Sequence, residues 1–250
     1  MKKIKLFIKK IVKFGTAHYC IFCGSMLRKF DQLGYDFPVL KEKKVVGGGL
    51  RDGLCPICHS TDRERVQKLF FEKFDNWKKV PNFKILHIAP EIRLIDYFET
   101  FNNIIYTKGD KFTKGYTYPE GVINVDVTNM QFNECTFDLV ICNHVLEHII
   151  DDIQAMKEIY RVMKPGAKAV LQVPISLVLE QSHEDYSITS EAERNKFYGQ
   201  FDHVRLYGQD YKSRLEKIGF KVSKIAPIEL TSEIKKYGIN PEEYLYVCEK

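Results

Sequence analysis

Four cysteines in the first quarter of the sequence have the spacing of metal ligands. They form two Cys-x-x-Cys pairs, Cys20 with Cys23 and Cys55 with Cys58. The tight turn within such a pair directs both thiolates at one ion, and four thiolates make a closed tetrahedral zinc site of the ribbon type. Because a closed site has no open position for a substrate, these cysteines predict a structural Zn²⁺ that replaces the core a short segment cannot build. His59, next to Cys58, is a weaker candidate for the fourth ligand.

A second set of potential metal ligands lies in the middle of the sequence. His144, Glu147 and His148 match the H-x-x-E-H motif of the inverted zinc peptidases, in which the motif lies within a helix. Here the apolar segment 137–142 has the pattern of a buried strand that ends directly before Asn143. His144 is therefore expected at the bend between a strand and a helix, and we predict that the motif holds no catalytic zinc ion of the peptidase kind.

The elements that must position these residues alternate along the second part of the chain. Strands are expected at 83–89, 103–107, 122–125, 137–142, 167–173, 220–225 and 244–248, with helices at 92–98, 144–160 and 211–218. Such alternation predicts an open, mostly parallel sheet with helices on both faces. Ligands of sheets of this kind bind beyond the carboxyl ends of the strands.

Six motifs in this region, taken together, resemble the class I S-adenosylmethionine-dependent methyltransferases. They read, in order, ILHIAP, YTKGD, VDVT, FDLVICNHVLEHI, VMKPGAKAVLQVP and LEKIGF. The likeness covers residues 81–250 and is closest to the group that methylates small molecules and glycans. It implies an α/β, Rossmann-like, doubly wound sheet of seven strands whose last strand is antiparallel. It also implies S-adenosylmethionine as the cofactor.

The resemblance indicates which residues lie at the cofactor. After the first strand the family normally has D/E-x-G-x-G-x-G, whose glycines let the backbone approach the cofactor. The aligned positions here are His87, Ala89, Glu91 and Arg93, so each expected glycine is absent. The predicted cofactor-binding residues are His87, Ala89, Pro90, Glu91, Asp110, Asp126, Val127, Asn143 and His144.

Each of the later cofactor residues has a specific role in the family pattern. Asp110 matches the acidic residue that holds the ribose hydroxyls, and Asp126, with Val127 beside it, matches the position that contacts adenine. Asn143 and His144 match positions under the methionine part of the cofactor. Taken singly, either aspartate has the alternative of capping a helix or a loop. The order of the motifs favours the cofactor role.

The acceptor is expected to contact the long polar stretch between Pro174 and Gly208, which predicts a lid or an acceptor pocket. Methylation of a hydroxyl requires a base, and His203 or His183 is the predicted general base. Arg205 is predicted to position an anionic or hydroxylated acceptor, and an H-V-R run of this kind is frequent in similar sequences. The alternative for His203 is that it only braces the lid through hydrogen bonds.

The first 80 residues are basic, with 18 lysines and arginines against 8 aspartates and glutamates, whereas residues 81–250 hold 20 against 25. This asymmetry indicates a front end that binds an anionic partner and an acidic enzyme body. We expect a basic amphipathic helix at 1–18, a zinc-ribbon-like module at 19–62 with a flexible tip at Gly47-Gly48-Gly49, a linker helix at 63–80 and the methyltransferase domain at 81–250.

The predicted first helix has one apolar face and one face of lysines. Such a helix can lie on an anionic membrane through residues 1–14, or it can dock on its own protein. The apolar positions are Ile4, Phe7, Ile8, Ile11, Val12 and Phe14, and the lysines are Lys2, Lys3, Lys5, Lys9, Lys10 and Lys13. These lysines interrupt the apolar stretch, so it does not predict a secretory signal. Seven cysteines without an export signal favour a reducing cytoplasm, with the protein either free there or peripheral to a membrane.

The predicted activity is therefore methyl transfer to an oxygen of a small-molecule or glycan acceptor. One alternative is an RNA methyltransferase guided by the basic zinc module. Nucleic acid is the less favoured partner, because the front half lacks a pattern of stacking aromatic residues and the catalytic half is acidic. The other alternative is a non-catalytic protein whose glycine-free first loop no longer holds the cofactor.

Overall fold

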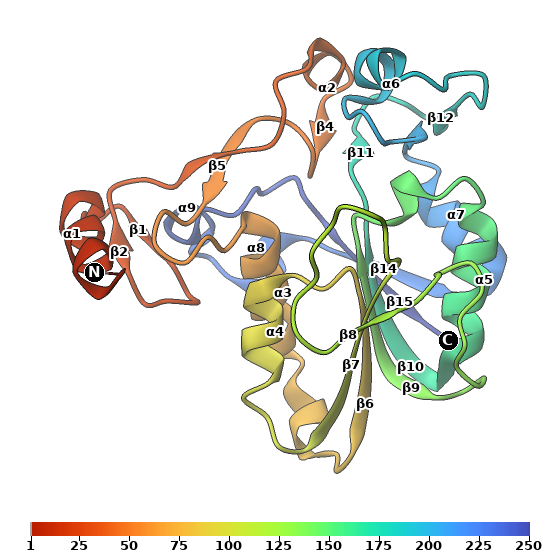
Figure 1. Ribbon diagram of the computed structural model, residues 1–250, viewed down its shortest axis with the longest axis horizontal. Helices are drawn as coiled ribbons and strands as arrows, with labels where there is room; N and C mark the ends of the chain where they lie inside the picture. Colours follow the sequence, from red (N-terminus) through yellow and green to blue (C-terminus); the bar gives the residue numbers. More distant parts are fainter. Residues whose placement is uncertain (1) are drawn as a thin grey trace.

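The computed structural model describes the backbone of residues 2–250 and the side chains from residue 7 onward. Its centre is a seven-stranded sheet in the order β14-β15-β10-β9-β6-β7-β8 (Figure 1). The strands are β6 Phe83–Ile88, β7 Ile104–Asp110, β8 Val122–Asn124, β9 Phe137–Asn143, β10 Met163–Gln172, β14 Lys221–Ile225 and β15 Leu245–Glu249. The pairs from β10 to β8 are parallel, whereas β15 runs antiparallel to both of its neighbours. The predicted sheet, with its antiparallel last strand, is confirmed.

Helices cover both faces of the sheet (Figure 1). Helices α5 Asp152–Val162 and α7 Tyr211–Ile218 pack on one face, and α3 Asp62–Lys73 and α4 Ile92–Phe98 pack on the other. Strand β9 is buried on both faces, so its sequence is apolar at successive positions. Val140 and Cys142 belong to the first hydrophobic core, and Leu139 and Ile141 belong to the second.

The helix expected at 144–160 is wrong in its first part. The segment after β9 forms a single 3-10 turn, η2 Leu146–His148, and α5 begins only at Asp152. Two local features separate them. His144 has a left-handed backbone with φ of 53°, and the Asp151 side chain accepts a hydrogen bond from the Gln154 N–H as the N-cap of α5.

The front of the chain is built from short elements. They are α1 Lys2–Lys13, β1 His18–Tyr19, β2 Met26–Leu27, β3 Asp31–Leu33, α2 Pro38–Glu42, β4 Val45–Val46 and β5 Arg51–Leu54. β4 pairs with β11 Ile175–Ser176, which directly follows the end of β10. The expectation of a flexible tip at 47–49 is wrong, because this pairing holds the glycines against the domain that contains the seven-stranded sheet, and Gly47 is buried.

The segment after β11 is a small layer above the sheet (Figure 1). It contains β12 His183–Glu184, α6 Glu191–Tyr198 and β13 Arg205–Leu206, and β12 pairs with β13. The remaining elements are η1 Asp75–Lys79, α8 Pro227–Leu230 and α9 Ile234–Tyr237. α6 lies beside α2 (Figure 1), so this layer and the front of the chain meet over the carboxyl edge of the sheet.

Arg65 joins the front of the chain to its C-terminal part. This side chain on α3 is completely buried. Its guanidinium donates hydrogen bonds to the carbonyl oxygens of Ser60 and Gly53 and to those of Tyr237 and Gly238. Because the guanidinium is buried, its N–H groups need each of these acceptors as a hydrogen-bond partner. Helix α3 is therefore part of the core as well as a connection between two modules.

The amphipathic helix α1 exposes its apolar face. Phe7 is 65% exposed and Ile11 is 60% exposed. Ile8, Val12 and Phe14 are exposed as well, while Lys13 forms an ion pair of 2.6 Å with Asp31. The predicted positions of Ile4, Lys2, Lys3 and Lys5 lie outside the described side chains. Across residues 2–250, no helix has the length and apolar character needed to cross a bilayer.

Candidate functional site

The four predicted cysteine ligands converge within the module expected at residues 19–62, called the front module below. The Cys20 and Cys58 sulfurs are 3.6 Å apart, and those of Cys23 and Cys55 are 3.8 Å apart. All four lie within 4.8 Å of one another. Tetrahedral zinc with Zn–S bonds of about 2.3 Å requires sulfurs roughly 3.8 Å apart, so the donor set fits this ion. His59 is not a member of this group in the described part of the chain.

The two cysteine pairs have the same backbone turn. The Gly24 N–H donates to the Cys20 carbonyl, and the His59 N–H donates to the Cys55 carbonyl, each at 2.9 Å. Gly24 and His59 both have left-handed backbones, with φ of 67° and 62°. His59 therefore takes the turn position that glycine takes in the first pair, which explains why its side chain is not a ligand.

The loop after β6 makes the turn of a glycine without containing one. Ala89 has φ of 48°, and its N–H donates to the Gly109 carbonyl at 2.8 Å. A left-handed backbone costs an L-residue with a Cβ about 1–2 kcal/mol. Buried Pro90 follows it directly. The chain thus makes a tight turn after β6 without the glycines of the family pattern.

Glu91 places a carboxylate at the joint end of β6 and β9. Its Oε2 is 2.7 Å from Nε2 of buried His87, and its Oε1 accepts from Nδ2 of Asn143 at 3.1 Å. The other His87 nitrogen is 2.7 Å from the Tyr106 hydroxyl. Burial opposes ionisation, but the hydrogen bond from His87 holds the pKa of Glu91 below its usual range. The family pattern has its acidic residue at the His87 position. Here the negative charge comes from Glu91, whose side chain is 18% exposed.

Asp110 and Asp126 lie at the ends of neighbouring strands, further along the same edge. Burial raises the pKa of Asp110. Asp126 accepts hydrogen bonds from the Lys111 ammonium and from the backbone and hydroxyl of Thr128, which lower its pKa to about 2. The Val127 side chain is buried. Oδ1 of Asp126 thus accepts hydrogen bonds within its own loop, from Thr128. Oδ2 pairs with Lys111, which is largely exposed.

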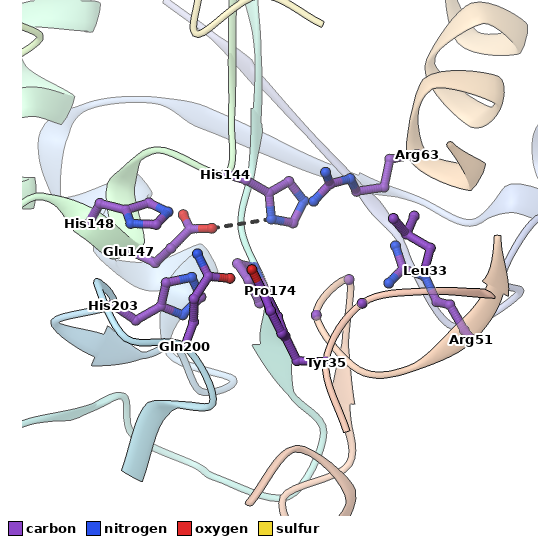
Figure 2. A pocket seen from close by; sticks show the side chains of 13 residues that line it. Leu33, Tyr35, Arg51, Arg63, His144, Glu147, His148, Pro174, Gln200 and His203 are labelled. Atoms are coloured by element: carbon purple, nitrogen blue, oxygen red, sulfur yellow. Dashed lines mark ion pairs between the residues drawn. The ribbon is translucent and has the colours of Figure 1, made fainter. Parts of the chain in front are cut away.

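A cavity of about 470 Å³ lies beside the end of β9 (Figure 2). Its walls come from the front module, the η2 turn, and the layer that contains α6. It is lined by Leu33, Gly34, Tyr35, Gly47, Gly48, Arg51, Arg63, His144, Glu147, His148, Pro174, Gln200 and His203. Of the predicted site residues, His144 and His203 are brought together here.

A compact group of titratable side chains occupies one end of the cavity (Figure 2). The rings of His148 and His203 are 4.7 Å apart and nearly perpendicular, and Nδ1 of His148 is 3.3 Å from an Asp202 oxygen. Burial raises the pKa of Glu147 to about 7. Burial, reinforced by His148, lowers the pKa of His203 to about 3. Nδ1 of His144 is 3.2 Å from Glu147.

The other two predicted catalytic residues do not line this cavity. Arg205 is completely buried, and its guanidinium donates to the carbonyls of Leu146 and Ile150 and to the Glu184 carboxylate. These contacts hold the η2 turn in place. His183 is exposed on β12, where its ring packs against Tyr198. Residues 174–208 therefore supply one predicted base, His203, to the cavity.

Two cavity residues that sequence reasoning missed are arginines from the front of the chain. Arg51 donates to both oxygens of Asp62, and Arg63 has a buried Nε without a hydrogen-bond partner in the described structure. Both lie in segments interpreted as a separate module and a linker. No local signal marks either of them, because a charged run such as Asp62-Arg63-Glu64-Arg65 is also ordinary on a solvated helix.

The sheet order, the carboxylates at its edge, and the cavity beside β9 agree with the arrangement that the resemblance to class I methyltransferases implies. In agreement, the family described as "Methyltransferase domain" matches residues 93–171. Over these residues the chain is similar to the methyltransferases.

Parts of the chain are similar to known proteins. The chloroplastic 2-phytyl-1,4-beta-naphthoquinone methyltransferase of Arabidopsis thaliana is 41% identical over 46 residues, 18% of each protein. An uncharacterised protein of Methanocaldococcus jannaschii is 29% identical over 123 residues, 48% of this chain and 53% of that protein. A solved S-adenosylmethionine-dependent methyltransferase from Archaeoglobus fulgidus, 15% identical, covers 76% of this chain and 95% of its own, with a TM-score of 0.49. The chain spans about half or less of the length of the curated relatives it matches.

Proposed function

We propose that this chain transfers the methyl group of S-adenosylmethionine to a small-molecule acceptor in the cavity beside His144. The observation that carries the proposal is the position of this cavity, which opens at the carboxyl edge of the sheet where β9 presents Asn143 and His144. Open α/β sheets bind their ligands at this edge. The similarity to an enzyme named for methylation of a naphthoquinone supports a small-molecule acceptor.

The residues at the sheet edge are suited to the polar ends of the cofactor. Its methionine part carries an ammonium and a carboxylate. The ionised Glu91 would accept hydrogen bonds from the ammonium beside Asn143, and Arg63, with its unpartnered Nε, would pair with the carboxylate. Asp110 would hold the ribose hydroxyls and Asp126, with Val127, the adenine. When bound, the cofactor supplies a methyl group on a positively charged sulfur.

The residues of the cavity are suited to an acceptor that carries a hydroxyl or a negative charge. Arg51 and Arg63 lie on one side, and Gln200 and His203 lie on the other (Figure 2). A hydroxyl must lose its proton as the methyl group arrives. We assign this proton loss to the end of the cavity that contains His203, which makes O-methylation the proposed reaction. Holding the acceptor in line with the methyl group supplies much of the remaining rate.

The test measures cofactor binding and methyl transfer separately. Calorimetry with S-adenosylmethionine should give saturable binding, and a methyl-labelled cofactor should transfer label to members of a panel of quinols, phenols and glycosides. His203→Ala should abolish transfer while cofactor binding persists. If His183→Ala abolishes transfer instead, the assignment to His203 is wrong. No cofactor binding would support the non-catalytic alternative, and salt-dependent labelling of RNA would support the RNA alternative.

We also propose that the four cysteines hold one structural zinc ion. The supporting observation is that the four sulfurs lie at the spacing that tetrahedral zinc requires. The ion would fix the start of helix α3 through Cys55 and Cys58, since α3 begins at Asp62. Metal analysis of the purified protein by mass spectrometry should find zinc, and protein free of metal would contradict this assignment.

We propose peripheral membrane contact through α1. Its exposed phenylalanine and aliphatic side chains, with Lys9, Lys10 and Lys13 close by, have the chemistry that an anionic lipid surface recognises. Such contact would place the protein at the cytoplasmic side of a membrane. The protein should float with vesicles that contain phosphatidylserine, and Ile8→Asp with Ile11→Asp should abolish this. Equal flotation of the variant would refute the proposal.

A further inference from the structure

Three side chains at one end of the cavity form a donor set of mixed histidine and carboxylate type. Glu147 and His148 come from the η2 turn, and His203 comes from the segment directly before β13. Each offers one ligand atom, and the three atoms lie within 4.8 Å of one another. Figure 2 shows them gathered on the same side of the cavity. A single small ion could contact all three.

Several polar atoms of this group have no hydrogen-bond partner within the described structure. Glu147 is 1% exposed, and neither of its carboxylate oxygens has a hydrogen bond within the described structure. Nδ1 of buried His203 also lacks one there. His144 lies 3.2 Å from Glu147, as the dashed line in Figure 2 marks, but it does not satisfy the geometry of a hydrogen bond. A buried carboxylate without donors is destabilising, and a bound cation removes this cost.

The surroundings of the group have the features of a metal site. Nδ1 of His148 is 3.3 Å from Oδ2 of Asp202, which leaves Nε2 available as a ligand atom. The other Asp202 oxygen accepts from the Gln200 amide at 2.8 Å. Metal-binding histidines commonly donate their second N–H to a carboxylate, which fixes the ring orientation and the tautomer.

The two segments that carry these side chains are fastened to each other. The Val204 N–H donates to the Glu147 carbonyl at 2.9 Å. The buried Arg205 donates to the carbonyls of Leu146 and Ile150 on either side of the η2 turn. Completely buried charged groups of this kind hold their partners tightly. These contacts keep the two segments that carry the three side chains next to each other.

We propose that Glu147, His148 and His203 bind a divalent cation of the Zn²⁺ or Fe²⁺ type, with its remaining coordination positions toward the cavity. Two histidines and one carboxylate with open positions are the donors of catalytic zinc sites and of non-haem ferrous sites. His144 is not a ligand, so this set differs from that of the H-x-x-E-H peptidases. It also differs from the four-thiolate site, which has no open position.

This inference rests on the proposed function and specifies the acceptor as a compound whose hydroxyl binds the cation. A cation held by these residues would lower the pKa of a hydroxyl bound to it, and the proton would pass to water. The oxygen would then form a bond to the methyl carbon as the bond from sulfur to that carbon breaks, which would leave the neutral thioether. His203 thus promotes proton loss as a ligand of the cation. Catechols, hydroquinones and vicinal diols are the acceptors of this class, since a second oxygen can fill another coordination position.

The test counts metal ions on the full-length protein, independently of activity. Calorimetric titration with Zn²⁺ should give two equivalents, one in the cysteine site and one in the cavity. Co²⁺ should distinguish the two sites, because only Co²⁺ in the cysteine site gives intense charge-transfer absorption. His148→Ala and His203→Ala should each remove one equivalent and keep the charge-transfer band, which also reports folding. His183→Ala, a histidine outside the cavity, is the matched control and should keep both equivalents.

Further outcomes separate this inference from the proposed function. Asp202→Asn should weaken the second equivalent about 10- to 100-fold while the cysteine site is unchanged. Binding of one equivalent only by the unmodified protein, or retention of two by His203→Ala, would overturn the metal site. Methyl transfer that persists after the second ion is removed would overturn the role proposed for the ion in binding the acceptor hydroxyl, and would leave the proposed function intact. Failure to bind S-adenosylmethionine would refute the proposed function, whatever the metal count.

Discussion

Replacing Glu91 with glutamine tests whether its carboxylate binds the ammonium of the cofactor. The substitution keeps the shape of the side chain and removes its charge. In the present structure Glu91 accepts from His87 on one oxygen and from Asn143 on the other. Glutamine can accept with its oxygen, but its amide group would then face the Asn143 amide, which is already a donor to Gln67. The site would thus lose both its negative charge and one acceptor.

The size of the effect follows from the kind of hydrogen bond that is lost. A hydrogen bond to a charged group contributes about 1.5–3 kcal/mol. Since about 1.4 kcal/mol corresponds to a tenfold change in Kd, Glu91→Gln should raise the Kd for S-adenosylmethionine roughly 10- to 150-fold. Isothermal titration calorimetry measures this directly. Glu99→Gln, which removes an exposed carboxylate paired with Lys108, is the control and should bind as the unmodified protein does.

Two cofactor analogues separate the proposed contact from general damage to the site. S-adenosylhomocysteine has the same ammonium, so its affinity should fall by a similar factor in Glu91→Gln. Methylthioadenosine lacks the amino-acid part, so its affinity should be nearly unchanged. Equal losses for all three compounds would mean that Glu91 supports the loop after β6 and does not contact the ammonium. Unchanged binding of S-adenosylmethionine would refute the reasoning entirely.

Three further predictions concern stability. Cys58→Ser should abolish zinc binding and lower the free energy of unfolding by more than about 3 kcal/mol. Metal analysis and denaturant titration measure the two effects, and Cys135→Ser, at an exposed cysteine, should show neither. Ala89→Gly should raise that free energy by about 0.5–1 kcal/mol, since φ is 48° there. Burial, together with Asp62, raises the pKa of Glu243 from 4.5 to about 7, so the folded protein binds its proton more tightly than the unfolded chain does. The free energy of unfolding should therefore fall as the pH rises through this range. Glu243→Gln should remove up to roughly 3 kcal/mol of that fall, and thermal melts at pH 5 and pH 8 measure it.

Much of the fold could be predicted because its signals are local. The helix expected at 92–98 is α4 Ile92–Phe98, and the helix expected at 211–218 is α7 Tyr211–Ile218. The strand expected at 83–89 is β6, one residue shorter. The segment 144–160 shows where local signals fail. Its apolar spacing suits one helix, but the positive φ of His144 and the cap at Asp151 divide it, and neither follows from periodicity.

The cavity could be predicted only in part, because its walls meet through contacts between distant segments. His144 and His203 carry signals of their own, in the motif after β9 and in the H-V-R run. Arg51 and Arg63 carry none of this kind, because the front module reaches the cavity through the pairing of β4 with β11, more than 120 residues away. Pairing between short strands this far apart leaves no regular pattern in the sequence.

The front module is a wall of the proposed active site, and this bears on the choice of acceptor. A Cβ added at Gly47 would lie 3.3 Å from the His144 ring and 3.1 Å from a Glu243 oxygen, and φ there is 82°. Glycine is therefore needed for the module to approach so closely. An RNA-binding module would present its basic groups to the outside, whereas Arg51 and Arg63 face a cavity of about 470 Å³. A volume of this size suits a small molecule or the end of a larger one. If the proposed acceptor and cofactor bind there, their negative groups would account for part of the basic charge that suggested a nucleic acid at the front of the chain.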